Sequence, residues 1–328
     1  MVLRVGIFGT GSFANVHANI LARMENVSIT AICGSTLEKA EKMTKNHPAA
    51  KAYSSVTEML DNTQLDAAYI CVPPFSHGKI EEALVDRSIP FFVEKPLSTE
   101  IETPTIILDA VTKKKLLTSV GYHFRYMNIT AKAKELLQDR TIGMAVGQWM
   151  GEMPGVQWWK KKESSGGQLV EQTTHLIDLL RYLLGEVDEV NAVFANRFMH
   201  LKEVGTDVPD IGTVILKMKN GAIATINNTC MLPMSYKNGL EIYTDAGVLE
   251  LSPNGLKEYS ADQSTEYSNG NAYNYFHIPY QKETQAFIHA VQTGDASGIL
   301  SSYEDAWNTQ RITTAANRSA ETGQPVRL

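Results

Sequence analysis

A glycine-rich turn near the start of the chain constrains the fold more than any other feature. Residues 3–8 are mostly apolar or β-branched, and they lead directly into Gly9-Thr10-Gly11-Ser12-Phe13-Ala14 and a helical pattern that runs to Met24. In a strand–turn–helix unit of this kind, the first glycine permits the tight turn and the second leaves room for a pyrophosphate. The helix N-terminus then favours the anion. The turn predicts a dinucleotide site formed by residues 9–13, and a tight turn without a ligand is the alternative.

The end of the next strand-like run bears on the choice of dinucleotide. Residues 28–33 are followed by Gly34-Ser35-Thr36, where NAD-preferring proteins carry an acid for the ribose 2′-hydroxyl. The hydroxyls of Ser35 and Thr36, with Lys39 nearby, could instead accept a 2′-phosphate. The cofactor is therefore NAD or NADP with a slight lean to NADP, although both residues could equally cap the following helix.

A pair of prolines ends another apolar run. Pro73-Pro74 follow residues 67–72, and because proline cannot continue a central strand, they turn the chain across the carboxyl edge of the sheet. His77 lies just beyond, in the first turn of a helix that we expect to begin at Ser76 or His77. It either packs near the ribose or only satisfies local hydrogen bonds, and the local role is favoured.

A lysine stands at the end of a further run. Residues 89–93 are followed by Glu94-Lys95-Pro96, which places Lys95 at the carboxyl edge where an open α/β sheet binds its ligand. Lys95 would bring a positive charge to the point where a substrate hydroxyl meets a nicotinamide. With the alternation of strands and helices up to Gly121, the pattern predicts a doubly wound parallel sheet over residues 1–121.

The hydrophobic period changes after Gly121. Longer segments of alternating polarity follow, and Asn220-Gly221 and Ala246-Gly247 are hairpin signals between them. We predict an α/β chain whose second domain, residues 122–328, is α+β, with a large open, mostly antiparallel sheet and helices on one side. The polar stretch 257–275 is expected to be a long excursion, and the chain closes with helices near 280–292 and 303–320.

A second group of chemically active residues lies in this domain. Glu171, His175 and Asp178 are spaced i, i+4 and i+7, so on one helix they share a face, with leucines on the opposite side. The alternative is a helix N-terminus with ordinary capping acids and a solvated histidine.

These motifs together resemble the Gfo/Idh/MocA oxidoreductase family. The matching landmarks occur in order: Gly9 to Ala14, Pro73-Pro74 with His77, Glu94-Lys95-Pro96, Gly166-Gly167 to Asp178, and Ser319 to Val326. The resemblance implies a Rossmann domain, a sugar or polyol held between the domains, and an open sheet that often forms the oligomer interface. It also implies that Lys95 and His175 are the catalytic pair, with an acid four residues before the histidine. The family commonly has aspartate where Glu171 stands and glycine where Thr173 stands, which leaves the substrate open.

The implied reaction assigns a role to each residue of the pair. Hydride transfer belongs to the cofactor, and His175 takes the hydroxyl proton, because imidazole titrates in the right range. Lys95 stabilises the developing alkoxide and favours the neutral form of His175. Glu171 either reaches the substrate or only orients His175.

Several further residues are candidates for the substrate pocket. Arg125 could bind a sugar hydroxyl or a phosphate, or form an interdomain salt bridge. Trp158 and Trp159 could pack on a sugar ring or anchor a loop. The complete set of substrate candidates comprises Tyr122, Arg125, Trp158, Trp159 and Asp178, and His123 is a weaker one.

Composition narrows the class of protein. The net charge of −6 and the shortness of every basic run give no sign of a nucleic-acid partner, and no apolar run is long enough to span a bilayer. Cys33, Cys71 and Cys230 are odd in number and far apart, which favours buried thiols over a zinc site, and no metal is predicted. We expect a cytoplasmic enzyme without a signal peptide, acting as a homodimer or homotetramer. A redox-neutral NAD-using enzyme, such as a glycosidase or an epimerase, and a nucleotide-sensing regulator are the alternatives.

Overall fold

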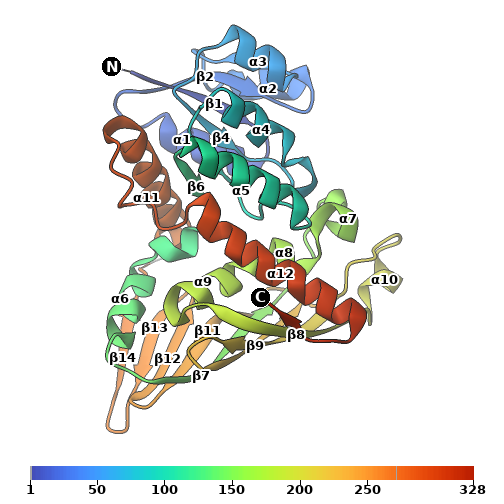
Figure 1. Cartoon of the computed structure of the whole chain (residues 1–328), viewed down its shortest axis with the longest axis vertical. Helices are drawn as coiled ribbons and strands as arrows, with labels where there is room; N and C mark the ends of the chain where they lie inside the picture. Colours follow the sequence, from blue (N-terminus) through green and yellow to red (C-terminus); the bar gives the residue numbers. More distant parts are fainter. Residues whose placement is uncertain (1, 271) are drawn as a thin grey trace. The chain divides into compact units, whose positions relative to one another are not determined.

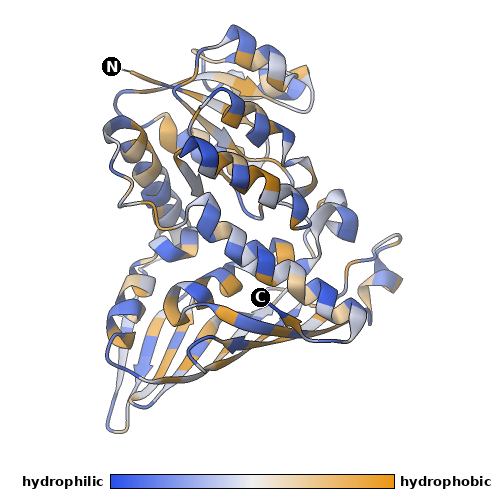
Figure 2. Cartoon of the chain, viewed as in Figure 1, coloured by the Kyte–Doolittle hydropathy of each residue, from blue (hydrophilic) through white to orange (hydrophobic). Residues whose placement is uncertain are grey.

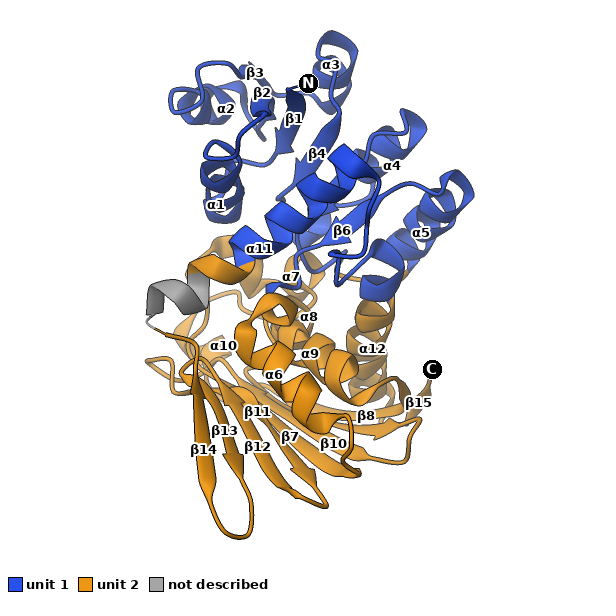
Figure 3. Ribbon diagram, turned by 90° about the vertical axis from the view of Figure 1, so that its left-hand side faces the viewer, with its two compact units in different colours: residues 1–98, 102–123, 280–307 blue, residues 99–101, 124–279, 308–328 orange. Residues whose placement is uncertain are grey.

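The computed structural model describes residues 2–270 and 272–328, with the side chains of residues 272–276 outside the description. The chain forms two compact units (Figure 3). Unit 1 contains the residues up to Ser98, Glu102–His123 and Tyr280–Trp307; unit 2 contains Thr99–Ile101, Phe124–Pro279 and Asn308–Leu328. The sequence predicts a single boundary after residue 121, whereas in the structure the chain leaves unit 1 after His123 and returns to it at Tyr280.

Unit 1 is built on a six-stranded parallel sheet with the strand order β3-β2-β1-β4-β5-β6 (Figure 1). All four residues of β4 are buried, as expected for a central parallel strand that helices cover on both faces. The predicted doubly wound sheet is confirmed. Its strands are β1 (Leu3–Phe8), β2 (Val27–Cys33), β3 (Lys51–Tyr53), β4 (Ala67–Ile70), β5 (Phe91–Val93) and β6 (Thr118–Val120).

The helices of unit 1 connect these strands. Thr36 and Ser55 cap two of them by accepting a hydrogen bond from a backbone N–H in the first turn. The helices are α1 (Ser12–Leu21), α2 (Leu37–Thr44), α3 (Val56–Asn62), α4 (Lys79–Asp86), α5 (Glu102–Lys114) and most of α11 (Ala272–Thr293), with the short 3₁₀ helix η1 (Pro74–Ser76). A second 3₁₀ helix, η2 (His123–Tyr126), has its first residue in unit 1 and the other three in unit 2.

Unit 2 is built on a nine-stranded sheet with the order β14-β13-β12-β11-β7-β10-β9-β8-β15. Neighbours are antiparallel except β7 and β10, which confirms a largely antiparallel open sheet. The two predicted turns are also present, with Gly221 and Gly247 at positive φ. The strands are β7 (Ile142–Met150), β8 (Val187–Ala195), β9 (Ile211–Met218), β10 (Ile223–Thr229), β11 (Lys237–Thr244), β12 (Gly247–Ser252), β13 (Gly255–Tyr259), β14 (Ser264–Ser268) and β15 (Val326–Arg327).

Within the described part of the chain, helices cover only one face of this sheet (Figure 1 and Figure 3). Along β9, Val214 and Leu216 are buried while Thr213 and Ile215 are exposed. Figure 2 shows the resulting alternation of apolar and polar residues along the strands. The helices of unit 2 are α6 (Asn128–Leu137), α7 (Lys162–Ser165), α8 (Gln168–Glu171), α9 (Thr174–Leu184), α10 (Met199–Lys202) and the larger part of α12 (Tyr303–Thr322), with the 3₁₀ helix η3 (Gln157–Lys160).

One sequence-based expectation about this sheet is wrong. Residues 257–259 and 264–268 of the predicted excursion 257–275 belong to β13 and β14, which pair antiparallel with each other at the sheet edge. The alternation rule missed β14 because an edge strand with the sequence Ser-Thr-Glu-Tyr-Ser buries none of its residues. Asn271 lies outside the described residues.

Candidate active site

The turn between β1 and α1 has the geometry of a dinucleotide site. Gly9 adopts φ +111°, and a Cβ there would lie 2.0 Å from the Cys71 carbonyl oxygen, so a side chain cannot be accommodated. At Gly11, which precedes α1, a Cβ would meet no atom within 4 Å, and no side chain caps the helix. Ala14 is completely buried, as close helix–strand packing requires. The N-terminus of α1 thus faces open space and fits a pyrophosphate.

The residues after β2 are arranged in a way that suits both interpretations given to them, as caps of the following helix and as a site for a ribose 2′-phosphate. Thr36 caps α2 by accepting a hydrogen bond from the Lys39 backbone N–H at 3.3 Å. The Lys39 ammonium donates to Ser35 Oγ at 3.0 Å, and all three residues are exposed. A hydroxyl and a cation therefore lie together where the ribose would be bound, without a carboxylate among residues 34–36.

His77 has a local role in the structure. The expected start of the helix at Ser76 or His77 is wrong, because α4 begins only at Lys79. The carboxylate of Glu81 determines this start: it accepts a hydrogen bond from the Gly78 backbone N–H at 2.7 Å and lies 2.6 Å from His77 Nδ1. The imidazole of His77 is thereby oriented from within its own turn.

The residues after β5 include an unexpected partner. Glu94 is 4% exposed, and its Oε1 lies 2.9 Å from Nε2 of His17, which is fully buried in α1. The next residue is Lys95. The pKa of the nearby His123 imidazole is lowered to about 3, first by burial and then by Lys95 and His17. Sequence reasoning missed His17, although a histidine on the otherwise apolar face of a predicted helix was a usable signal.

In unit 2, the predicted single helix through Glu171, His175 and Asp178 is wrong. The chain breaks between α8 and α9 at Gln172-Thr173, so Glu171 does not share a helix with the other two residues. Contacts to other elements hold the short α8 in place: Asn228 Nδ2 donates to Gln168 Oε1 at 2.7 Å, and Trp159 Nε1 donates to Glu171 Oε2 at 2.7 Å. These tertiary contacts were not visible in the residue spacing.

His175 lies in an aromatic environment. Its ring stacks on Phe124 with centroids 4.8 Å apart, and Trp149 lies nearly parallel to it at 6.1 Å. The residue is only 5% exposed, so the alternative interpretation as a solvated histidine is wrong. The flat packing defines the plane of the imidazole. Sequence reasoning did not identify Phe124 or Trp149.

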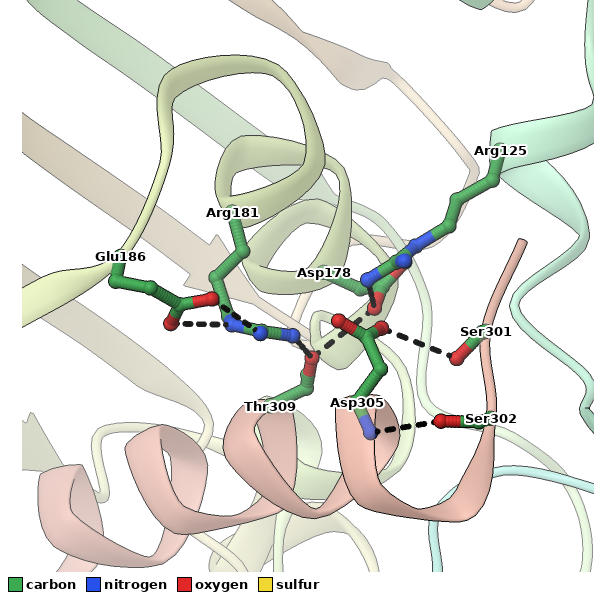
Figure 4. A network of polar contacts seen from close by, with 8 residues as sticks. All are labelled: Arg125, Asp178, Arg181, Glu186, Ser301, Ser302, Asp305 and Thr309. Atoms are coloured by element: carbon green, nitrogen blue, oxygen red, sulfur yellow. Dashed lines mark hydrogen bonds and ion pairs between the residues drawn. The ribbon is translucent and has the colours of Figure 1, made fainter.

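Asp178 belongs to a buried polar network (Figure 4). Its two carboxylate oxygens each accept a hydrogen bond from Arg125 at 2.7 Å, and Oδ1 also accepts from Thr309 Oγ1 at 3.0 Å. The hydroxyl of Thr309 in turn accepts from Arg181 at 2.8 Å, and Arg181 pairs with Glu186. Arg125 and Asp178 both belong to unit 2, so their ion pair is not an interdomain salt bridge.

The remaining substrate candidates are largely enclosed. Tyr122 is fully buried in the core of unit 1. Trp159 is 1% exposed and packs with Met199 and Cys230, and Trp158 lies partly buried beside it, which matches the interpretation of the tryptophan pair as an anchor.

A pocket of about 640 Å³ lies in unit 2. Trp149, which flanks His175, and Gln172, which follows Glu171, both line it. Lys237, Asn238 and Glu241 add polar groups from β11. Its volume is within the range of small-molecule sites, roughly 300–1,000 Å³.

The three cysteines are free and buried, as expected. Burial raises the pKa of the Cys33 thiol to about 11 and that of Cys230 to about 12, so both remain protonated at neutral pH. Across the described residues, no helix combines the length and the apolar character needed to cross a bilayer.

Two family models match the chain. The oxidoreductase family with an NAD-binding Rossmann fold matches residues 3–122, and the GFO/IDH/MocA C-terminal domain matches residues 130–250. The chain belongs to the Gfo/Idh/MocA family. It is an oxidoreductase that acts on CH–OH groups with a nicotinamide cofactor.

Curated relatives match the chain along almost its entire length. Myo-inositol 2-dehydrogenase of Thermotoga maritima is 25% identical, covering 99% of this chain and 98% of its own length. Inositol 2-dehydrogenase/D-chiro-inositol 3-dehydrogenase of Lacticaseibacillus casei is 27% identical, with 99% and 94% covered. Among solved structures, levoglucosan dehydrogenase in complex with NADH has the same fold, with a TM-score of 0.86, 21% identity, and 99% and 98% coverage.

Proposed function

We propose that this chain is an NAD(P)-dependent dehydrogenase that interconverts a secondary alcohol and a ketone on a cyclic polyol or a sugar. The observation that carries the proposal is the position of Lys95, two residues after the end of β5 in a sheet whose β1–α1 turn fits a dinucleotide. The two relatives named as inositol dehydrogenases support the class of substrate.

The roles of the side chains follow from their chemistry. The bound nicotinamide supplies hydride transfer at its C4 atom. The Lys95 ammonium stabilises the negative charge that develops on the substrate oxygen. His175 accepts the hydroxyl proton, and stacking on Phe124 holds its ring in one plane. Glu171 stands before the break that separates it from His175; its carboxylate is fixed by the Trp159 indole, and it contacts the substrate or orients the base.

The experiment that tests this proposal is a double-mutant cycle in turnover. We expect Lys95→Ala to lower kcat by about a hundredfold or more, the scale of a lost electrostatic stabiliser. His175→Asn should cause a similar loss, and because both residues act on one hydroxyl, the double variant should lose less than the product of the two effects. Substrates are a panel of inositols and sugars with both cofactors, followed by the absorbance of the reduced nicotinamide.

Lys45→Ala is the matched control, since Lys45 is an exposed lysine of the same unit. If the turnover of Lys95→Ala is within about threefold of wild type, Lys95 has no part in the mechanism, because losing a charge stabiliser should cost far more. Substrate conversion without stoichiometric change of the cofactor would point to the redox-neutral alternative. Tight cofactor binding without any turnover would point to a regulator.

We also propose that the β2 end accepts NADP at least as well as NAD. Support comes from the Ser35–Lys39 contact and from the lack of an acid among residues 34–36. Lys39→Ala should raise the KM for NADP and leave that for NAD unchanged, whereas Ser35→Asp should favour NAD by offering a carboxylate to the 2′-hydroxyl. Equal effects of Lys39→Ala on both cofactors would contradict this preference.

A third proposal concerns assembly as a homodimer or homotetramer through the open sheet face of unit 2. Exposed apolar side chains support it: Val193 is 71% exposed, Ile223 50% and Ile215 43%. A patch of this kind on a sheet without covering helices is typical of an interface between subunits. Ile215→Glu should reduce the mass measured by light scattering to that of a monomer, and an unchanged mass would contradict the proposal.

A further inference from the structure

Unit 1 contains a buried cluster of three titratable side chains from distant parts of the chain. His17 belongs to α1, Glu94 follows β5, and Glu283 belongs to α11. A ring nitrogen of His17 and one carboxyl oxygen from each glutamate all lie within 4.8 Å of one another. His17 and Glu283 are 0% exposed and Glu94 is 4% exposed, so water does not screen their charges.

The three side chains are unequally satisfied. His17 has a partner at each ring nitrogen, Thr284 Oγ1 at 3.0 Å and Glu94 Oε1 at 2.9 Å. Neither carboxyl oxygen of Glu283 has a hydrogen-bond partner among the residues that the structure describes. An ionised carboxylate buried in this way, without a cation or a donor, is strongly unfavourable.

The other groups facing the cluster do not supply a cation to Glu283. Cys71 lies close to both acids, and burial together with their charges raises the pKa of its thiol well above the usual range. Tyr280 of α11 packs its ring on His17 and on His123, whose pKa is lowered to about 3 by burial and by Lys95 and His17. Burial and the charge of Glu94 raise the pKa of Glu283 well above its usual range.

We propose that Glu283 is a positioning residue of the active site: as a neutral carboxylic acid it keeps one proton beside Glu94 and so holds the Glu94–His17 pair that precedes Lys95. Two carboxyl groups this close in a dry site do not both ionise. A neutral Glu283 leaves the negative charge on Glu94 alone and places an O–H donor beside the acceptor oxygens of Glu94. An ionised Glu283 would repel Glu94 and displace the turn that carries Lys95. The effect on turnover rests on the proposed function; the protonation state does not.

Two substitutions separate the shape of Glu283 from its proton. Glu283→Gln keeps the size and cannot ionise, and Glu283→Ala removes the group. Glu81→Gln is the matched control, because Glu81 is another fully buried acid of unit 1 whose oxygens face His77 Nδ1 and the Gly78 N–H. In the infrared spectrum of the chain without cofactor, we expect the band of a protonated carboxyl in wild type and in Glu81→Gln and its loss in Glu283→Gln.

Turnover provides the second readout. Glu283→Ala should lower kcat at least tenfold, and Glu283→Gln should recover most of that loss, a rescue expected of a group that acts through its neutral form. The pH profile of kcat in wild type should fall on the alkaline side as Glu283 ionises, and the Gln variant should lack this limb.

Three outcomes would overturn the proposal. One is an infrared band that persists in Glu283→Gln. Another is a stoichiometric divalent metal, found by elemental analysis of purified wild type and absent from Glu283→Gln, which would make the cluster a metal site. The third is a folded Glu283→Gln variant as impaired as Glu283→Ala. If wild type turns over none of the substrates, the proposed function fails, while the infrared and metal measurements still decide the state of Glu283.

Discussion

Unit 1 and unit 2 each bury a carboxyl group completely, and the two groups have opposite surroundings. Asp178 in unit 2 accepts two hydrogen bonds from Arg125 and one from Thr309. Glu283 in unit 1 has no hydrogen-bond partner among the described residues and faces a second acid, Glu94. The difference shows that a fold can bury an acid in two ways, by pairing its charge or by keeping it neutral, and the two ways respond differently to mutation and pH.

The largest expected effect is the loss of the paired acid. Asp178→Asn leaves the Arg125 guanidinium buried without its counter-charge, which should cost about 3–5 kcal/mol of unfolding free energy. Chemical denaturation measures this loss. Glu186→Gln is the control from the same network, because the Glu186 side chain is 46% exposed and its pair should contribute at most about 1 kcal/mol. If the two variants lose the same unfolding free energy, the buried ion pair of this unit contributes no more to stability than the exposed one.

In contrast to Asp178→Asn, Glu283→Gln should remove a loss of stability that wild type shows as pH rises. Because the pKa of Glu283 is raised in the folded state, wild type keeps a proton that the unfolded chain loses near its ordinary pKa. Wild type should therefore lose stability as pH rises from about 4.5 toward the folded pKa, at about 1.4 kcal/mol per pH unit, and the Gln variant should not. Thermal unfolding at a series of pH values tests this. A stability difference that does not change with pH would mean that Glu283 is ionised in the folded protein.

His123 provides the matching test for a buried base of unit 1. Its folded pKa of about 3 lies below the ordinary 6.5, so the unfolded chain binds a proton that the folded protein does not. Wild type should lose stability as pH falls from 6.5 toward 3, with a limiting slope of about 1.4 kcal/mol per pH unit. His123→Phe, which keeps an aromatic ring against Tyr280, should reduce this loss. Identical acid unfolding curves for the two proteins would contradict the assignment.

The smallest expected effect concerns the partly buried acid Glu171. Trp159→Phe keeps most of the apolar packing and removes the indole donor, so we expect a loss of about 1.5–3 kcal/mol, the range for a hydrogen bond to a charged group. Trp158→Phe is the control on the neighbouring tryptophan, and denaturant midpoints compare the two. A larger loss in Trp158→Phe would mean that packing, not the bond to Glu171, dominates at this pair.

The sequence was most reliable where backbone geometry restricts residue choice. Gly9 was assigned to the dinucleotide turn because a tight strand-to-helix turn favours a residue without a side chain, and Gly11 because it leaves room for a pyrophosphate; the structure has that turn. Gly221 and Gly247 were placed in hairpins for a similar reason, their positive φ. The alternation in β9 predicted a sheet covered on one face. In each case the signal was local, within about ten residues of the element that it specifies.

The candidate site was predicted less completely. Lys95 could be placed at a strand end from neighbouring residues alone. The partners of Asp178 and Glu171 could not, because Arg125 and Trp159 are distant in sequence and only the packing of unit 2 brings them to these acids. The spacing of Glu171 and His175 even suggested the wrong geometry, since the chain breaks between α8 and α9.

The sequence by itself determined the parallel sheet, its dinucleotide turn and the lysine at its edge, since each depends on local backbone preferences and hydrophobic periodicity. Only the tertiary structure decided which buried acids carry a charge. Whether a carboxyl group ionises depends on the donors, cations and acids within a few ångströms of it. For Glu283 those neighbours, His17 and Glu94, come from positions far away in the chain.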